Sequence, residues 1–283
     1  MLKLIDPGDR EFEFTEGDFH CVRDLVQRHT GIALGEAKRD MIYARLAARL
    51  RKLGLTRVSE YCARLRTGQD RHELERFRNA VTTNLTGFFR EPYHFSFLRE
   101  HLIERMREAG HYGKRLRIWS AGCSTGEEAY SIAMTLRETI PDIDQWDVRV
   151  IASDIDSSVL NKARRAAYPI EAVAEIDMPK VKRWFRRGKG ANEGWVRVVP
   201  EITRMVDFQA FSLNGIWPHI ETLDMVFCRN VTIYFEPETT RRLLHRFDDV
   251  LRPDGLLFIG HSETLKGLHD GYRLLGHTIY QRG

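Results

Sequence analysis

Two glutamates follow a glycine-rich turn in residues 119–128, WSAGCSTGEE, where an apolar run gives way to a helical pattern. Gly122 and Gly126 permit a tight turn in which the backbone approaches a ligand closely at the start of a helix. A phosphate-binding loop would carry Lys and then Ser or Thr after its last glycine, and a helix start that binds pyrophosphate favours positive charge. Glu127 and Glu128 would repel a pyrophosphate but tolerate a cation. The stretch therefore favours a ligand such as S-adenosylmethionine, which carries a sulfonium and an ammonium group.

Asp154 ends the next apolar run, in residues 151–156, IASDID. A carboxylate at the end of such a strand accepts hydrogen bonds from both hydroxyls of a ribose lying across the strand ends. Enzymes that bind NAD share this device, so the two glutamates, and not Asp154, favour S-adenosylmethionine. In the alternative interpretation, Asp154 caps a helix and the glutamates interact with a helix dipole.

The segments that position these residues alternate between strand and helix after Gly113. Apolar runs predict strands at 116–121, 148–153, 206–211, 223–228 and 256–260, and helical periodicity predicts helices at 125–140, 156–167 and 237–251. This order indicates an α/β fold with a mostly parallel sheet covered on both faces. Residues 272–280 favour a closing antiparallel hairpin through Gly276. Glycines and alternating apolar residues between 168 and 203 favour a small antiparallel insertion.

The first hundred residues have helical patterns throughout. We expect helices at 18–29, 38–53, 73–81 and 93–108, with Gly31 ending the first and Ser59 capping another that carries Tyr61, Cys62 and Leu65. Residues 21–90 hold 15 Lys or Arg against 7 Asp or Glu, a net charge of +8, so the rest of the chain carries −4. This basic region would face nucleic acid, a membrane surface or an acidic protein, unless its charges only coat solvated helices.

Composition indicates a folded protein with room for two domains, because 283 residues include 42% hydrophobic and 30% charged side chains. No apolar run approaches the roughly 20 residues of a membrane span, and the N-terminus lacks a signal-peptide pattern, so we expect a cytoplasmic protein. No HExxH-like signature is present, and the four cysteines are widely separated, so we expect reduced thiols and no metal. These are Cys21, Cys62, Cys123 and Cys228.

Several motifs resemble the CheR family, the glutamate O-methyltransferases of methyl-accepting chemotaxis receptors, and the resemblance runs across nearly the whole chain. They are TTNLTGFFRE at 82–91, GCSTGEE at 122–128, ASDID at 152–156, FCRNVTIYF at 227–235 and PDGLLFIGHSE at 253–263. The resemblance implies a class I, Rossmann-like S-adenosylmethionine-dependent methyltransferase domain at 113–283 with a β-subdomain inserted at about 168–203. It also implies a helical linker at 81–112 that contributes to the active site, and an N-terminal all-α, receptor-facing domain at 1–80.

The resemblance also implies roles for individual residues. The family positions that contact S-adenosylmethionine, or its product S-adenosylhomocysteine, match Asn84, Thr86, Arg90, Glu128, Asp154, Ser212, Leu213, Arg229 and Asn230. Among them, Glu128 and Asp154 correspond to residues that hold the charged end and the ribose. Ser212 departs from the family's Asn-Leu pattern, and its shorter side chain puts the adenine contact in question.

A glutamate substrate is already ionised at neutral pH and needs no general base. The enzyme must strip its water and aim one carboxylate oxygen at the methyl group. Arg90 suits this aiming role because a guanidinium grips a carboxylate rigidly, and Tyr234 is the second candidate through its hydroxyl. In the alternative readings, Arg90 pairs with Glu91 or another acid, and Tyr234 is a packing aromatic.

Two rival functions follow from the same sequence. A nucleic-acid methyltransferase would explain the basic N-terminal region, but residues 228–231 read CRNV where amino-methylating enzymes carry Asn/Asp-Pro-Pro-aromatic. A non-catalytic docking protein is the second rival. The family resemblance instead implies that the basic helices face receptor cytoplasmic helices, without nucleic acid or membrane insertion. It also implies that the loop 187–190, RGKG, belongs to a β-subdomain that in some members binds a receptor C-terminal peptide by strand addition.

Overall fold

The computed structural model describes residues 10–107 and 114–283. They form two compact units, one of residues up to Thr83 together with Tyr234–Thr239, and the other of Asn84–Ile233 and Thr240–Gly283. Each unit has its own buried apolar cluster. Within the described ranges, no helix is both long enough and apolar enough to cross a membrane.

The N-terminal unit is built from four α-helices, as the periodicity predicts. They are α1 (Glu16–Thr30), α2 (Arg39–Leu53), α3 (Val58–Arg66) and α4 (Arg71–Val81), with a short 3-10 turn η2 (Glu36–Lys38) before α2. Thr15 and Asp18 form a capping box at the start of α1, and Gly31 ends this helix in the left-handed conformation, with φ 78°. The prediction that Ser59 caps α3 is wrong, because the helix already begins at Val58 without a side-chain cap.

Much of the positive charge of this unit lies in ion pairs between its own helices and loops. Glu73 of α4 is 1% exposed and accepts hydrogen bonds from the guanidinium of Arg49 and from the Tyr61 hydroxyl, at 2.7 Å. Arg39 and Arg64 pair with Glu16 and Asp70. These pairs account for part of the basic surface without an external partner.

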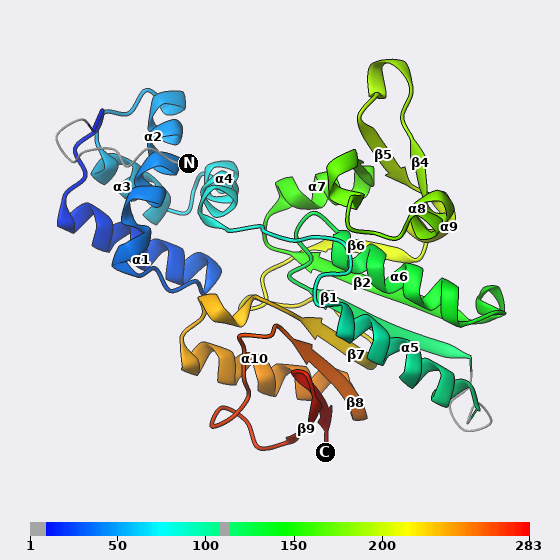
Figure 1. Cartoon of the computed structure of the whole chain (residues 1–283). Coiled ribbons are helices and arrows are strands. Elements are labelled where there is room, and N and C mark those ends of the chain that lie inside the picture. The colour runs from blue at the N-terminus through cyan, green and yellow to red at the C-terminus, as the bar shows by residue number, and fades with distance from the viewer. Residues whose placement is uncertain (1–9, 108–113) are drawn as a thin grey trace. The chain divides into compact units, whose positions relative to one another are not determined.

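The second unit contains a seven-stranded sheet in the order β6-β2-β1-β7-β8-β10-β9 (Figure 1). Its strands are β1 (Arg115–Ala121), β2 (Asp147–Asp154), β6 (Val206–Ala210), β7 (Leu223–Cys228), β8 (Leu251–Ile259), β9 (Tyr272–Gly276) and β10 (Ile279–Arg282). Strands β6, β2, β1, β7 and β8 are parallel, and β10 pairs antiparallel with β8 and β9. This arrangement confirms the α/β class and the closing hairpin that the sequence predicts, although the turn itself lies at His277 and Thr278.

Helices cover both faces of this sheet. They are α5 (Pro92–Arg107), α6 (Glu127–Thr139), α7 (Ser157–Arg165) and α10 (Pro237–Val250), with the 3-10 turns η3 (Ile143–Gln145) and η6 (Thr232–Tyr234). Phe95 of α5 stacks on Phe227 of β7. Trp119 of β1 contacts Phe247 of α10 at 5.5 Å between ring centroids. Because strand side chains alternate between faces, α5 and α10 lie on opposite sides of the sheet.

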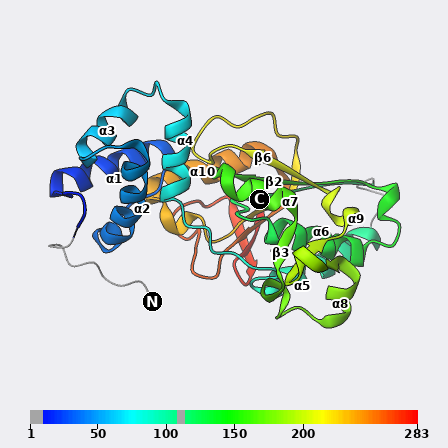
Figure 2. The same cartoon turned by 90° about the horizontal axis from the view of Figure 1, so that it is seen from above.

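The predicted antiparallel insertion is present as a separate three-stranded sheet in the order β3-β5-β4, beside α8 and α9 (Figures 1 and 2). Its elements are β3 (Ala167–Pro169), η4 (Ile170–Val173), α8 (Met178–Trp184), β4 (Phe185–Arg187), η5 (Gly190–Asn192), β5 (Trp195–Val198) and α9 (Pro200–Thr203). Trp184 is fully buried and donates to Glu138 of α6 at 2.7 Å. This hydrogen bond joins the end of α8, directly before β4 of the small sheet, to helix α6 of the main sheet.

Candidate active site

The turn between β1 and α6 brings backbone amides to the carboxyl ends of the parallel strands. Gly122 and Gly126 have φ of 88° and 95°, which favours glycine at both positions. A Cβ atom at Gly122 would lie 2.6 Å from Cγ2 of Val231, and one at Gly126 would lie 2.9 Å from Cβ of Ala163. The glycines therefore let this turn pack closely against α7 and the segment after β7.

Asp154 ends β2 beside this turn and is 9% exposed. Its Oδ2 accepts a hydrogen bond from the Ser124 amide at 2.8 Å, and its Oδ1 accepts one from the Asp156 amide at 2.9 Å. Burial raises the pKa of Asp154 to about 6. Each carboxylate oxygen has a second lone pair, so the side chain can still accept hydrogen bonds from a ligand's hydroxyl groups.

The two glutamates after Gly126 have different partners. Glu127 accepts a hydrogen bond from the Thr125 hydroxyl at 2.7 Å. Glu128 accepts one from the Ser120 hydroxyl at 2.7 Å and pairs with Nη1 of Arg229 at 3.0 Å. Burial raises the pKa of both glutamates. Glu128 is thus the member of the pair that connects α6 to the end of β7.

Asn84, Thr86 and Arg90 belong to the linker segment between α4 and α5. Nδ2 of Asn84 donates to Asp156 at 2.8 Å, and its carbonyl accepts from the Ser124 hydroxyl at 3.0 Å, so Asn84 lies against the Asp154 turn. Thr86 and Arg90 line a cleft of about 640 Å³, whose far wall includes Asp177 and Lys180. Nη1 of Arg90 donates to the Leu85 carbonyl at 3.1 Å.

Glu91 follows Arg90 in the chain, and the sequence indicates it only as an alternative partner of that arginine. It instead pairs with Nη2 of Arg229 at 3.1 Å and with Nδ1 of His261 at 2.8 Å. Burial alone would raise the pKa of Glu91, but the His261 hydrogen bond and the Arg229 charge hold it at about 2. Arg229 also donates to the Arg90 carbonyl at 2.5 Å, which ties the linker to the end of β7.

Asn230 follows Arg229 in the left-handed conformation, with φ 58°. Asn is among the non-glycine residues that tolerate this region. Its amide and those of the next residues donate to Glu263, which lies in the segment after β8. This contact of Glu263 cannot be predicted from the sequence, because every residue type except proline has a backbone amide donor.

Ser212 and Leu213 follow β6. The Ser212 hydroxyl accepts from the Asn214 amide at 3.2 Å, and the Leu213 carbonyl accepts from the Trp217 indole at 3.0 Å and from Nη1 of Arg246 at 2.6 Å. The guanidinium of Arg246 also lies 3.8 Å from the centre of the Trp217 ring. The segment is therefore fixed by α10, with the Ser212 hydroxyl proton still available as a donor.

Tyr234 belongs to the N-terminal unit and does not join these residues within the second one. Its carbonyl accepts a hydrogen bond from the Ala33 amide at 2.7 Å, and Nζ of Lys38 lies 4.5 Å from the centre of its ring. The other predicted site residues all belong to the second unit. A catalytic role for Tyr234 stays a prediction.

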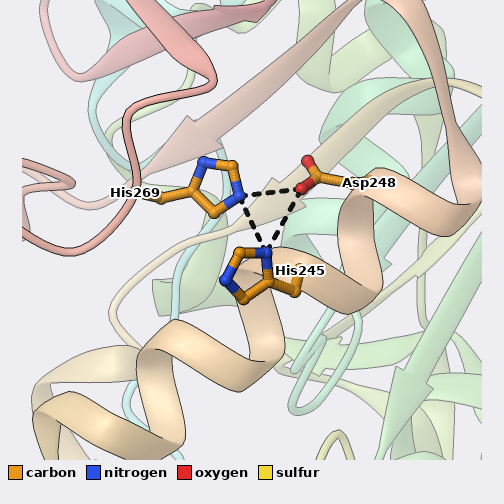
Figure 3. A group of neighbouring side chains, drawn as sticks. All are labelled: His245, Asp248 and His269. Carbon is orange, nitrogen blue, oxygen red and sulfur yellow. Dashed lines mark hydrogen bonds and ion pairs between the residues drawn. The ribbon is translucent and has the colours of Figure 1, made fainter.

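A separate polar cluster of His245, Asp248 and His269 lies between α10 and the segment before β9 (Figure 3). Nε2 of His269 is 2.8 Å from Oδ2 of Asp248 and 3.2 Å from Nδ1 of His245. The Gly271 amide donates to Nδ1 of His269 at 3.0 Å, so a neutral His269 carries its proton on Nε2. In this arrangement Nε2 donates to Asp248 and offers no lone pair to a metal ion.

The second unit therefore gathers carboxylates and strained turns at the carboxyl ends of β1, β2 and β7. Arg229 is flanked by Glu91 and Glu128, so the two acids outnumber the cation. Asp154 places a hydrogen-bond acceptor at the position where nucleoside ligands bind in open α/β sheets. The two acids around Arg229 suit the cationic S-adenosylmethionine better than a pyrophosphate.

Comparison with known proteins assigns both units to one family. Residues 84–281 match the family model described as CheR methyltransferase, SAM binding domain, and residues 17–82 match CheR methyltransferase, all-alpha domain. Chemotaxis protein methyltransferase 2 of Pseudomonas aeruginosa is 44% identical over 274 residues, 96% of this chain and 95% of the relative. The chemotaxis protein methyltransferase of Escherichia coli is 43% identical over 268 residues, 94% of this chain and 91% of the relative. The chain therefore belongs to the CheR family of S-adenosylmethionine-dependent chemotaxis methyltransferases.

Proposed function

We propose that the chain methylates glutamate side chains in the cytoplasmic helices of chemotaxis receptors, and that it acts in the cytoplasm. The observation that carries this proposal is the acid-rich ligand site around Asp154, Glu128 and Arg229, in a chain whose relatives are chemotaxis protein methyltransferases. Bound S-adenosylmethionine supplies the methyl group at its sulfonium.

The nine residues assigned to the cofactor by resemblance keep these roles as proposals. Asp154 would accept hydrogen bonds from the ribose hydroxyls, and Glu128 with Arg229 would hold the amino-acid end. Asn84 supports this assignment because it contacts Ser124 and Asp156 on either side of Asp154. Ser212 and Leu213 would lie near the adenine, where the hydroxyl of Ser212 remains able to donate.

Arg90 would orient the substrate carboxylate. Glu91, the acid beside it, is engaged by Arg229 and His261, and no acidic side chain in the described part of the chain pairs with Arg90. Its guanidinium lies at a cleft where a receptor glutamate would lose water, which makes the carboxylate a better nucleophile. Since that carboxylate is ionised at neutral pH, no proton has to be removed. Tyr234 is the second candidate for contact with it.

The test is transfer of radiolabelled methyl from S-adenosylmethionine to a purified receptor cytoplasmic domain. Arg90→Ala should lose most of the transfer, while Arg99→Ala, which removes another arginine from the same cleft, should keep it. Base-labile label identifies a carboxyl methyl ester. Base-stable label on added RNA would instead support a nucleic-acid methyltransferase. Transfer by Arg90→Ala at the same level as by an active Arg99→Ala would remove Arg90 from the mechanism.

The small sheet supports a finer proposal, that it binds an acidic receptor C-terminal peptide. A groove of about 740 Å³ beside β4 and β5 is lined by five basic residues, Lys162, Arg165, Arg186, Arg187 and Arg197. Strand β4 pairs on one side with β5, which leaves its other edge for an added strand within the described sheet. Receptor methylation that is unchanged after deletion of the receptor tail would contradict this proposal.

A further inference from the structure

The segment after β7 starts with a left-handed residue and has little regular structure to hold it. Asn230 adopts a left-handed conformation directly after Arg229, and a short 3-10 turn follows at Thr232–Tyr234. Asn tolerates this conformation, so the shape of the segment depends on the hydrogen bonds that its surroundings supply. Since Arg229 and Asn230 are the proposed cofactor contacts, whatever fixes this segment also fixes the site.

Glu263 supplies the constraint. Its Oε2 accepts hydrogen bonds from the amides of Asn230 at 2.8 Å and Gly260 at 2.5 Å. Its Oε1 accepts from the amides of Val231, Thr232 and Ile233 at 3.0, 2.7 and 3.3 Å, and from the Thr232 hydroxyl at 2.6 Å. The side chain is buried, at 7% exposed. One carboxylate therefore collects the amides of four consecutive residues and joins them to the end of β8.

The fit around this carboxylate is tight. A Cβ atom at Gly260 would lie 2.3 Å from Nδ2 of Asn230 and 2.8 Å from Oε2 of Glu263. Neither distance is possible without movement of the Asn230 side chain or of the Glu263 carboxylate. Gly260 thus lets the two side chains meet where β8 ends, next to the end of β7.

We propose that Glu263 is a positioning residue, which acts through the 230–233 backbone to place Arg229 and Asn230 for cofactor binding. This inference rests on the proposed role of those two residues. The positioning effect also reaches the linker, because Arg229 in turn pairs with Glu91 and donates to the carbonyl of Arg90. A carboxylate 33 residues away in sequence from Asn230 thereby determines the shape of the cofactor site.

The isosteric variant Glu263→Gln separates this role from simple space filling. Both oxygens of Glu263 face donors, so the glutamine NH₂ group would point at N–H donors in either orientation. Buried donors left unpaired are costly, and the segment should shift to satisfy them. We expect S-adenosylhomocysteine binding, measured by calorimetry, to weaken by about tenfold or more.

Glu73→Gln is the matched control. Glu73 is also a buried carboxylate surrounded by donors, from Arg49 and Tyr61, but it lies in the N-terminal unit. Both variants should lower the unfolding temperature, whereas Glu73→Gln should keep wild-type affinity for S-adenosylhomocysteine. Hydrogen exchange should increase at residues 229–233 and 260 in Glu263→Gln alone.

The outcomes are distinguishable. Wild-type affinity in a folded Glu263→Gln, with or without faster exchange at 229–233, would overturn the positioning role. If wild type itself failed to bind S-adenosylhomocysteine, the proposed cofactor contacts would be refuted. Separately, hydrogen exchange at 229–233 that is the same in Glu263→Gln as in wild type would overturn the anchoring by Glu263.

If Glu263→Gln did not fold, Thr232→Val would replace it, since this variant removes one donor to Oε1. It should weaken binding by a smaller factor, with Thr232→Ser restoring it, and equal affinity of both would contradict the proposal.

Discussion

Cofactor binding should weaken in mild acid, because the proposed role of Asp154, to accept two ribose hydrogen bonds, requires its ionised form. Burial raises its pKa to about 6 in the ligand-free protein. With that value, about ten in eleven molecules are ionised at pH 7 and about one in eleven at pH 5. A ligand that binds only the ionised form loses affinity in proportion to its population. The affinity for S-adenosylhomocysteine should therefore fall by about tenfold from pH 7 to pH 5.

The assay is calorimetric titration of S-adenosylhomocysteine between pH 5 and pH 8, on wild type and Asp154→Asn. The variant keeps the shape of the side chain but cannot titrate, so it should bind more weakly at pH 7 and change little with pH. Burial also raises the pKa of Glu127 and Glu128, so any remaining pH dependence in the variant reports these two carboxyl groups.

Two results would refute this reasoning about Asp154. The first is wild-type affinity that varies by less than about twofold between pH 5 and pH 7. The second is an Asp154→Asn variant with the full pH dependence, which would assign the titration to another carboxyl group. Circular dichroism at each pH serves as the control that the protein stays folded.

Three further substitutions test other parts of the structure. Tyr61→Phe removes the hydroxyl that donates to the buried Glu73, and should lower the free energy of unfolding in urea by about 1–2 kcal/mol without changing S-adenosylhomocysteine affinity. Gly260→Ala should weaken that affinity in calorimetry, because its methyl group would lie 2.3 Å from Nδ2 of Asn230; wild-type affinity would show that the Asn230 side chain moves freely. Arg246→Lys loses the planar contact with the Trp217 ring and one of two carbonyl contacts, so the segment of Ser212 and Leu213 should loosen and calorimetry should show weaker S-adenosylhomocysteine binding.

The central strands β1, β2 and β7 are predictable because most of their residues are buried and they are rich in apolar side chains. Residues 223–228 are the clearest case, since all six are buried in β7. Strand β3 was missed because it has three residues and ends in Pro169, so it shows no alternation. The expected cap at Ser59 does not form, because α3 already begins at Val58, and Val58 and Tyr61 are both buried in its first turn.

The chemistry at the strand ends was also visible in residue types. Asp154 and the glutamates after Gly126 lie next to the turn where the periodicity changes, so their proximity follows from parallel topology. Glu91 and Glu263 were not recognised, since their partners lie far away in sequence or are backbone amides. The interactions of Tyr234 were likewise not predictable, because they depend on a return of the chain to the N-terminal unit.

Four acids of the site, Glu91, Glu128, Asp154 and Glu263, have different partners, and these partners determine the role of each. Glu91 and Glu128 bracket Arg229, so this arginine is already neutralised and cannot serve as a phosphate receptor. The charge of Glu263 is met by backbone amides, which fix a loop rather than bind a ligand. Asp154 pairs with backbone amides and keeps acceptor capacity toward a ligand. The excess of negative charge around Arg229 is opposite to the needs of a pyrophosphate, and it suits a nucleoside that carries positive charge.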